Sequence, residues 1–141
     1  MNEKWIVPCN LKYFDIRKHF ETNNIVVWRN SFTIKAGDWV YIYLSAPVSA
    51  IKYRCRVITD IVTDEIINEN QYAIPMKESH NYYSKTTKYI VMELDKEYPN
   101  GLYSLKVLRQ HGLGQVQIQA RANRILSKYI DEIDHQIEAF N

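Results

Sequence analysis

Aromatic and cationic side chains alternate along two neighbouring runs of this sequence, on either side of a Ser-Ala-Pro loop. The first run carries the aromatic residues and the second the cations: Trp39, Tyr41, Tyr43, Lys52, Arg54 and Arg56. Aromatic rings stack on the flat faces of bases, and cations attract phosphate groups. If the two runs pair as a hairpin in register, both rows lie on one face of a sheet.

The intervening residues are apolar and predict the core-facing side of the same hairpin. They are Val40, Ile42, Leu44, Ile51, Tyr53, Cys55 and Val57. A small sheet must also be covered by helices, so we expect Trp39 and Tyr41 to lie beneath a helix and Tyr43 to stay open near the loop. Arg54 and Arg56 then either form a cationic rim around the covered aromatic residues or stack on these aromatic rings as cation–π pairs.

The sequence shows no pattern of an enzyme site. The four histidines lack zinc-ligand spacing, and neither Cys9 nor Cys55 has an evident activating partner. The segment HGLGQV has neither the Lys-Ser/Thr of a phosphate loop nor a GxGxxG pattern. We therefore expect no catalytic residues, no metal and no cofactor.

Composition is that of one globular domain over residues 1–141. The net charge of +2 allows nucleic-acid binding through a local basic patch without requiring it. Eleven tyrosines favour a surface or pocket for a partly polar ligand, or sheet surfaces on which tyrosine packs well. We see no signal peptide and no run of about 20 apolar residues, so we expect a reduced cytoplasmic protein without a membrane partner.

Periodicity and turn signals predict alternating strands and short helices. Strands are expected at 4–9, 25–28, 39–44, 50–58, 88–95 and 115–120. Helices are expected at 10–21, after the capping Ser104 as far as Gly112, and at 127–140, with one helical turn at 64–68 inside a polar excursion over 60–87. This order predicts an α+β domain with one strongly curled sheet.

The last of these helices is amphipathic. Its apolar positions fall at helical spacing and predict the buried face: Tyr129, Ile130, Ile133 and Ile137. Its acidic positions predict the solvent face: Asp131, Glu132 and Asp134.

The order of several short motifs resembles the EVE domain family, which belongs to the PUA-like superfamily with ASCH and YTH domains. These motifs are WIVPCN, the lone tryptophan of VVWRN, IKAGDWVYIYLSAP and IKYRCRV. The likeness covers most of the chain and is strongest over residues 4–58. It is weaker at 111–125, where many relatives have a Q-G-P-R run and this chain has Gln119, Ala120 and Arg121.

The resemblance implies a PUA-like small twisted β-barrel surrounded by short helices. It also implies a non-catalytic module that reads a modified base, such as 5-methylcytosine or a hydroxymethylated base, flipped into an aromatic cage. Trp28 would form one wall and the loop after the Gly-Asp signature another. With short polar side chains for the base edge, the expected pocket is Trp28, Asn30, Ser31, Tyr43, Ser45, Ala46, Pro47 and Ser49.

Phosphate contacts are expected from residues on the second strand of the hairpin and near the C-terminal helix: Lys52, Arg54, Gln119, Arg121 and Arg124. The resemblance implies DNA rather than RNA, and a nuclease or AAA-type partner in modification-dependent restriction. An alternative is an ASCH-like module that binds RNA or a small ligand without preference for a modification. Trp5 is expected in the core, and Trp28, which is followed by Arg-Asn-Ser, in the pocket.

Overall fold

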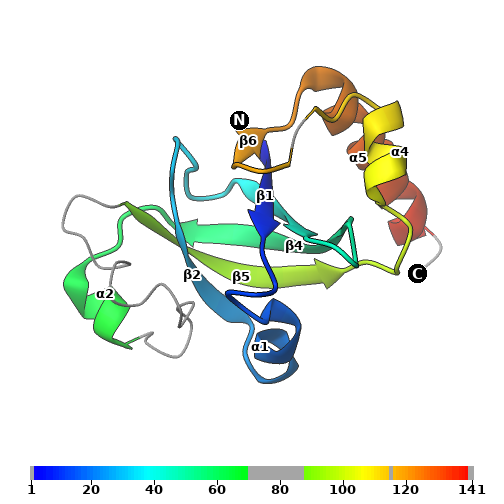
Figure 1. The fold of residues 1–141 in the computed structure, drawn as a ribbon. Coiled ribbons are helices and arrows are strands. Elements are labelled where there is room, and N and C mark those ends of the chain that lie inside the picture. Colours follow the sequence, from blue (N-terminus) through cyan, green and yellow to red (C-terminus); the bar gives the residue numbers. More distant parts are fainter. Residues whose placement is uncertain (1, 70–87, 115, 140–141) are drawn as a thin grey trace.

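The computed structural model describes residues 2–69, 88–114 and 116–139. In this part of the chain, six strands form one curled sheet in the order β2-β5-β4-β3-β1-β6 (Figure 1). The strands are β1 (Lys4–Cys9), β2 (Ile25–Arg29), β3 (Trp39–Leu44), β4 (Ala50–Thr59), β5 (Tyr89–Glu97) and β6 (Ala120–Arg121). β1 and β3 are parallel, and the other neighbouring pairs are antiparallel.

The helices of the described residues are α1 (Ile16–Thr22), α2 (Asp64–Glu69), α4 (Leu105–Gln110) and α5 (Arg124–Ala139). Asp15 caps α1 by accepting from the Lys18 N–H, and Ser104 caps α4 in the same way. α4 and α5 lie together on one side of the sheet, and α1 lies on the opposite side (Figure 1). The α+β fold expected from the sequence is confirmed.

The hairpin register explains how the aromatic and cationic rows meet. Trp39 pairs with Arg56 and Tyr41 with Arg54, as expected. The Arg54 guanidinium lies 4.8 Å from the centroid of the Trp39 ring, which makes a cation–π pair. A β-bulge then shifts the register, so that Tyr43 pairs with Ile51 rather than with a cation.

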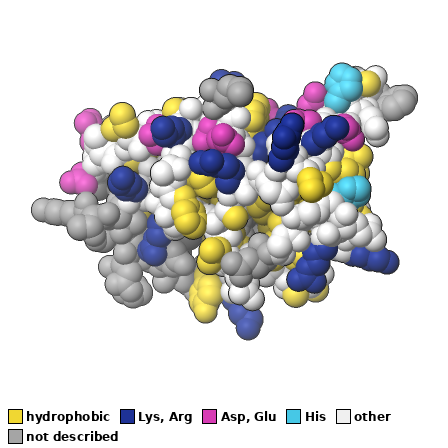
Figure 2. All heavy atoms as spheres, turned by 90° about the horizontal axis from the view of Figure 1, so that it is seen from above, with side chains coloured by type: hydrophobic (Ala, Val, Ile, Leu, Met, Phe, Trp, Pro, Cys, Tyr) yellow, Lys and Arg dark blue, Asp and Glu magenta, His cyan; other side chains and the backbone are white. Residues whose placement is uncertain are grey.

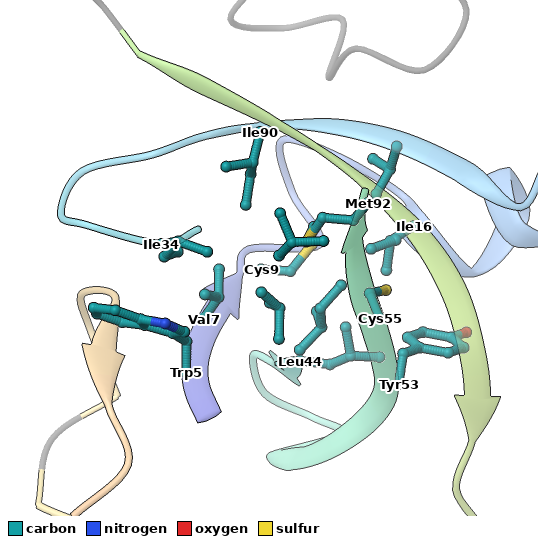
Figure 3. Packing of buried hydrophobic residues seen from close by; sticks show 14 residues of the cluster. Trp5, Val7, Cys9, Ile16, Ile34, Leu44, Tyr53, Cys55, Ile90 and Met92 are labelled. Carbon is teal, nitrogen blue, oxygen red and sulfur yellow. The ribbon is translucent and has the colours of Figure 1, made fainter. Parts of the chain in front are cut away.

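The main core fills the inside of the curled sheet. Figure 3 shows side chains from β1, β3, β4 and β5 pointing toward one another, closed by Ile16 of α1 and by Ile34. Trp5 is buried here, as expected, and its indole N–H donates to the buried Asp38 at 2.9 Å. Phe20 of α1 packs edge-on against Tyr53 of β4, which holds the helix against the open end of the sheet.

A second core lies between the outer face of β1, β3 and β4 and the pair α4 and α5. Tyr41 and Tyr43 are both buried in it, as is Ile51. Tyr43 is therefore not open near the loop, and Ile51 does not share a face with Tyr53, because the bulge between them reverses the direction of alternation. A third, smaller cluster joins β2 and β5 to α2.

Several predicted boundaries need correction. The predicted strand 115–120 is reduced to the two residues of β6, and the segment 116–119 is irregular. The first helix begins at Ile16 because residues 11–13 form a turn. α5 begins three residues before the predicted start, because Asn123 accepts from the Leu126 N–H and caps it. Most of the predicted excursion over 60–87 lies outside the described residues.

No helix in the described part of the chain is both long enough and apolar enough to cross a membrane.

Candidate functional site

A cavity of about 410 Å³ opens where the end of β1, the end of β2 and the segment before β6 come together. Its wall is mostly apolar or aromatic, with polar groups along one side. The lining residues are Pro8, Cys9, Asn10, Tyr13, Phe14, Trp28, Arg29, Ser31, Phe32, Gln117, Ile118 and Gln119. Its size and mixed lining are those of a small-molecule site in proteins.

Trp28 forms the inner aromatic wall of this cavity. It lies near the end of β2, is half-buried, and contacts both the main core and the Phe14 ring at 5.9 Å between centroids. The core fixes one part of the indole and leaves another part facing the cavity. Trp28, predicted to line a base pocket, lines this cavity and also packs against the main core, and its role in binding a base stays a prediction.

The mouth of the cavity carries large apolar side chains that water still reaches. Tyr13 is 54% exposed, Phe32 46% and Ile118 52%. They come from three separate segments, and Phe32 also stacks on Trp5 at 6.3 Å between centroids. Exposed apolar residues gathered around one opening are typical of a binding site.

Gln119 forms the polar side of the cavity and joins the two edges of the sheet. Its amide nitrogen donates to the Arg29 carbonyl at 2.6 Å, and its amide oxygen accepts from the Ser31 N–H at 3.0 Å. β2 and β6 are the two edge strands, so this buried side chain closes the seam between them. Both bonds hold the Gln119 amide against β2 and give it a structural role, and its predicted phosphate contact stays a prediction.

Asn30 shapes the loop that carries Ser31 and Phe32. Its side-chain oxygen accepts from the Phe32 and Ile34 N–H groups, and its amide nitrogen donates to the Ile34 carbonyl. Asn30 was predicted to contact a base, but these bonds direct it into its own loop. Ser31 does line the cavity, as predicted.

The predicted rim after the Gly-Asp signature lies elsewhere. Ser45 accepts from the Leu11 N–H and so supports the segment between β1 and α1. Pro47 lines a different cavity, Ala46 is exposed beside it, and Ser49 has a left-handed backbone with φ of 48°. The structure does not bring these residues, or the buried Tyr43, together with Trp28 in one pocket.

The predicted phosphate-binding cations divide into occupied and open ones. Arg54 pairs with Asp95, Asp134 and Glu138, so its charge is already neutralised within the fold. The Arg121 side chain is 56% exposed, makes a long pair with Glu3 at 3.8 Å, and lies over the Trp5 ring at 5.2 Å. Arg124 is exposed at the start of α5.

Tyr41 of the hairpin belongs to a buried network rather than to an open surface. Asp134 of α5, predicted on the solvent face, is only 5% exposed. It accepts hydrogen bonds from the hydroxyls of Tyr41, Tyr98 and Tyr103 at 2.7–3.1 Å and pairs with Arg54 at 3.0 Å. A buried carboxylate needs such partners, and Tyr41, Tyr98 and Tyr103 supply them.

Charged side chains of the described residues do not gather into one patch on the face shown in Figure 2. In the view from above, Lys and Arg are spread among Asp and Glu, with apolar groups between them (Figure 2). Among the described residues, no group of His, Cys, Asp and Glu is placed to hold a metal ion.

Sequence reasoning missed the residues of the cavity mouth. Tyr13, Phe32 and Ile118 lie in irregular segments, where strand and helix periodicity gives no information. One signal was available: Phe32 is a large aromatic residue in the polar run RNSFT, where a core residue is unexpected.

Comparison with protein family models gave no match, and comparison with curated proteins gave none either. Among solved structures, the ASCH protein from Zymomonas mobilis is similar over 92% of this chain and 94% of its own, with a TM-score of 0.67 and 10% identity. A serine-to-alanine mutant of it gives a TM-score of 0.68 at 11% identity, over 94% of this chain and 96% of its own.

A hypothetical protein from Leishmania major matches over 98% of both chains, with a TM-score of 0.61 and 13% identity. At such low identity these likenesses show the fold alone. The PUA-like fold expected from the sequence is thereby confirmed, whereas membership of the EVE family is not.

Proposed function

We propose that this protein is a nucleic-acid-binding module that receives one unstacked base in the cavity beside Trp28. The observation that carries the proposal is a half-buried tryptophan in a cavity of about 410 Å³ with exposed aromatic residues at its mouth. The fold shared with ASCH proteins supports the same class of function.

A base fits this lining because its faces are apolar and its edge is polar. Stacking on an aromatic side chain contributes about 1–3 kcal/mol per base. Extruding a base from a duplex costs a few kcal/mol, so the Trp28 wall together with edge hydrogen bonds offsets that cost. Ser31, Asn10 and Gln117 are polar, exposed and line the cavity, which supports the proposal that they bond to the edge of the base.

The finer part of the proposal is that the base is modified and belongs to DNA. Pro8, Cys9 and Phe14 give the cavity an apolar side, where an added methyl group gains contact. One methyl group discriminates by about 1–3 kcal/mol, enough to separate modified from unmodified sites. Such a sensor acts through a partner, and a nuclease or AAA-type protein is the partner we propose.

Replacing the inner wall tests the site. Trp28→Ala should lower the affinity for a matched oligonucleotide by about tenfold or more, the equivalent of losing one stacked base. Trp39→Ala is the control, because Trp39 is also half-buried but lies on the other face of the sheet. Binding is measured with DNA and RNA carrying cytosine, 5-methylcytosine, 5-hydroxymethylcytosine, adenine or N6-methyladenine. If a folded Trp28→Ala protein binds the oligonucleotide with unchanged affinity, the base does not bind in this cavity.

The proposal also says that the bound strand is returned unchanged. The purified protein is incubated with modified and unmodified DNA and RNA, with and without magnesium, and strands and nucleosides are analysed by mass spectrometry. We expect no cleavage and no base conversion. Conversion that is reproducible and disappears in Trp28→Ala would make the protein an enzyme.

A further inference from the structure

A second cavity, of about 530 Å³, lies where the β3–β4 loop meets α1 and the turn after β5. Its described lining residues are Arg17, Leu44, Pro47, Val48, Ala50, Lys52, Asn100 and Gly101. None of them lines the cavity beside Trp28. No Asp or Glu is among them, so its charge comes from Arg17 and Lys52.

The β-bulge determines where Lys52 points. The register passes from Tyr53 directly to Ile51, which leaves Lys52 as the extra residue between them. Bulges redirect side chains and are frequent beside binding sites. Without this bulge Lys52 would continue the row of Arg54 and Arg56 on the face covered by α5, whereas with it Lys52 lines the second cavity.

Lys52 keeps a positive charge that no ion pair with a described residue neutralises. Its ammonium donates to the Tyr98 carbonyl and to the Asn100 side-chain oxygen, each at 2.9 Å. Both partners are neutral, and Lys52 makes no ion pair within the described residues. An ammonium has three N–H donors, so one remains. Its neighbour Arg54, by contrast, pairs with carboxylates on three sides.

Arg17 and Asn100 add donors at the same place. Arg17 is exposed on α1, and its pair with Asp15 is long, at 3.8 Å, between two side chains that are each at least half exposed. Such a surface pair neutralises little charge. The Asn100 side-chain oxygen accepts from Lys52, so the N–H groups of the Asn100 amide stay available to donate to a ligand.

We propose that this second cavity binds a phosphate group. Phosphate has several strong acceptor oxygens and a charge that two cations balance better than one. The site does not depend on base binding beside Trp28. The phosphate belongs either to a free anion or to a nucleotide, and the recognising chemistry is the same.

The test follows backbone amide signals of the full chain by NMR during titration with sodium phosphate and, separately, with a nucleoside monophosphate. Sodium chloride at equal ionic strength is the reference. We expect saturable shifts at Lys52, Asn100 and Gly101. Saturation by both ligands identifies the free anion as sufficient, and saturation by the nucleotide alone identifies a nucleotide phosphate; either result supports the site.

Matched variants of α1 separate this site from general charge effects. Arg17→Gln should weaken binding by about tenfold, the loss of one charge-assisted hydrogen bond, while Lys18→Gln next to it should have no effect. Asp15→Asn keeps the helix cap but removes the competing carboxylate, so it should tighten binding. Lys52→Met should abolish it, and Trp28→Ala should leave it intact.

Absence of saturable shifts with both ligands would overturn the proposal. Equal affinity in the Arg17→Gln and Lys18→Gln proteins would also overturn it, since neither exposed side chain is needed for folding. Loss of phosphate binding in Trp28→Ala alone would assign the phosphate to the other cavity.

Discussion

Asp134 is the residue on which most of the polar interior depends. Its two carboxylate oxygens accept hydrogen bonds from tyrosines on β3, after β5 and before α4, and they pair with Arg54 of β4. Removing one partner of a buried ion pair lowers stability much more than replacing both partners by apolar residues, because the remaining charge is buried without compensation. The network therefore fixes α5 against the sheet.

We expect Asp134→Asn to lower the free energy of unfolding by about 3–5 kcal/mol, the usual cost of breaking a buried pair. The control is Asp131→Asn on the same helix, which loses a pair with Lys4 whose carboxylate is 65% exposed, while Lys4 keeps its bond to Ser127, so this change should cost less than Asp134→Asn. Urea unfolding of both variants measures the difference. Equal costs would mean that the buried network contributes no more than a surface pair.

The same tyrosines make stability sensitive to alkali. Burial raises the pKa of the Tyr41, Tyr98 and Tyr103 hydroxyls well above the ordinary value, and the Asp134 charge adds to the effect. Burial, with the charge of Glu97, raises the pKa of Tyr53 to about 12. The folded protein thus keeps protons that the unfolded chain releases near pH 10.

The contribution of these tyrosines to stability should be constant below about pH 10 and should fall as pH rises from there toward the folded pKa, by about 1.4 kcal/mol per pH unit for each such tyrosine. For Tyr53 the window is about pH 10 to about 12. Urea unfolding at several alkaline pH values, with tyrosinate absorbance followed in parallel, checks this. A stability that stays flat above pH 10 would contradict it.

At the scale of elements, the sheet is closed by a side chain rather than by a strand pair. β6 has only two residues, and Gln119 just before it carries the contact to β2. The wall of the candidate base cavity and the closure of the sheet are thus the same few atoms. Any change of this amide acts on both stability and binding.

Gln119→Ala should lower the free energy of unfolding by about 1–3 kcal/mol, because backbone groups of Arg29 and Ser31 lose buried partners. The matched control is Gln117→Ala, which lines the same cavity but is exposed. Hydrogen exchange at the Ser31 amide should accelerate in the first variant only. Unchanged protection there would show that other contacts hold the seam.

The sequence predicted the elements well and their junctions poorly. Alternation along β3 and β5 and the cap at Ser104 are local properties, so the chain itself reports them. The bulge at Lys52 interrupts an alternation of apolar and polar residues that looks continuous in the amino-acid sequence. The burial of Asp134 depends on tyrosines distant in sequence, and no helical pattern reveals that. For the site, Trp28 and Ser31 could be anticipated, and the mouth residues could not.

At the scale of the whole molecule, charge limits how nucleic acid can be held. The net charge is +2, and on the face shown in Figure 2 the cations are spread among carboxylates. Counterion release therefore comes from few contacts, and base stacking must supply a large part of the affinity. Arg121 and Arg124 remain the predicted phosphate contacts that are open to solvent.

The logarithm of affinity should fall with the logarithm of salt concentration with a slope of about 0.7–0.9 per phosphate contact, for a small number of contacts. Arg121→Gln and Arg124→Gln should each reduce the slope by about one contact. Lys35→Gln, an exposed cation outside the lining of either cavity, is the control. If the affinity does not depend on salt concentration, the ligand is a neutral small molecule rather than a nucleic acid.

The position of β1 also determines the order in which the strands of the sheet can pair. β1 lies between β3 and β6, so the first strand to be synthesised gains its second neighbour only when residues near 120 are available. Contacts of such high sequence separation slow folding, and until they form the outer edge of β1 can pair with another molecule. Until residues near 120 have been synthesised, the nascent chain exposes this edge, and a chaperone that covers short apolar segments such as WIVPC should raise the yield of folded protein.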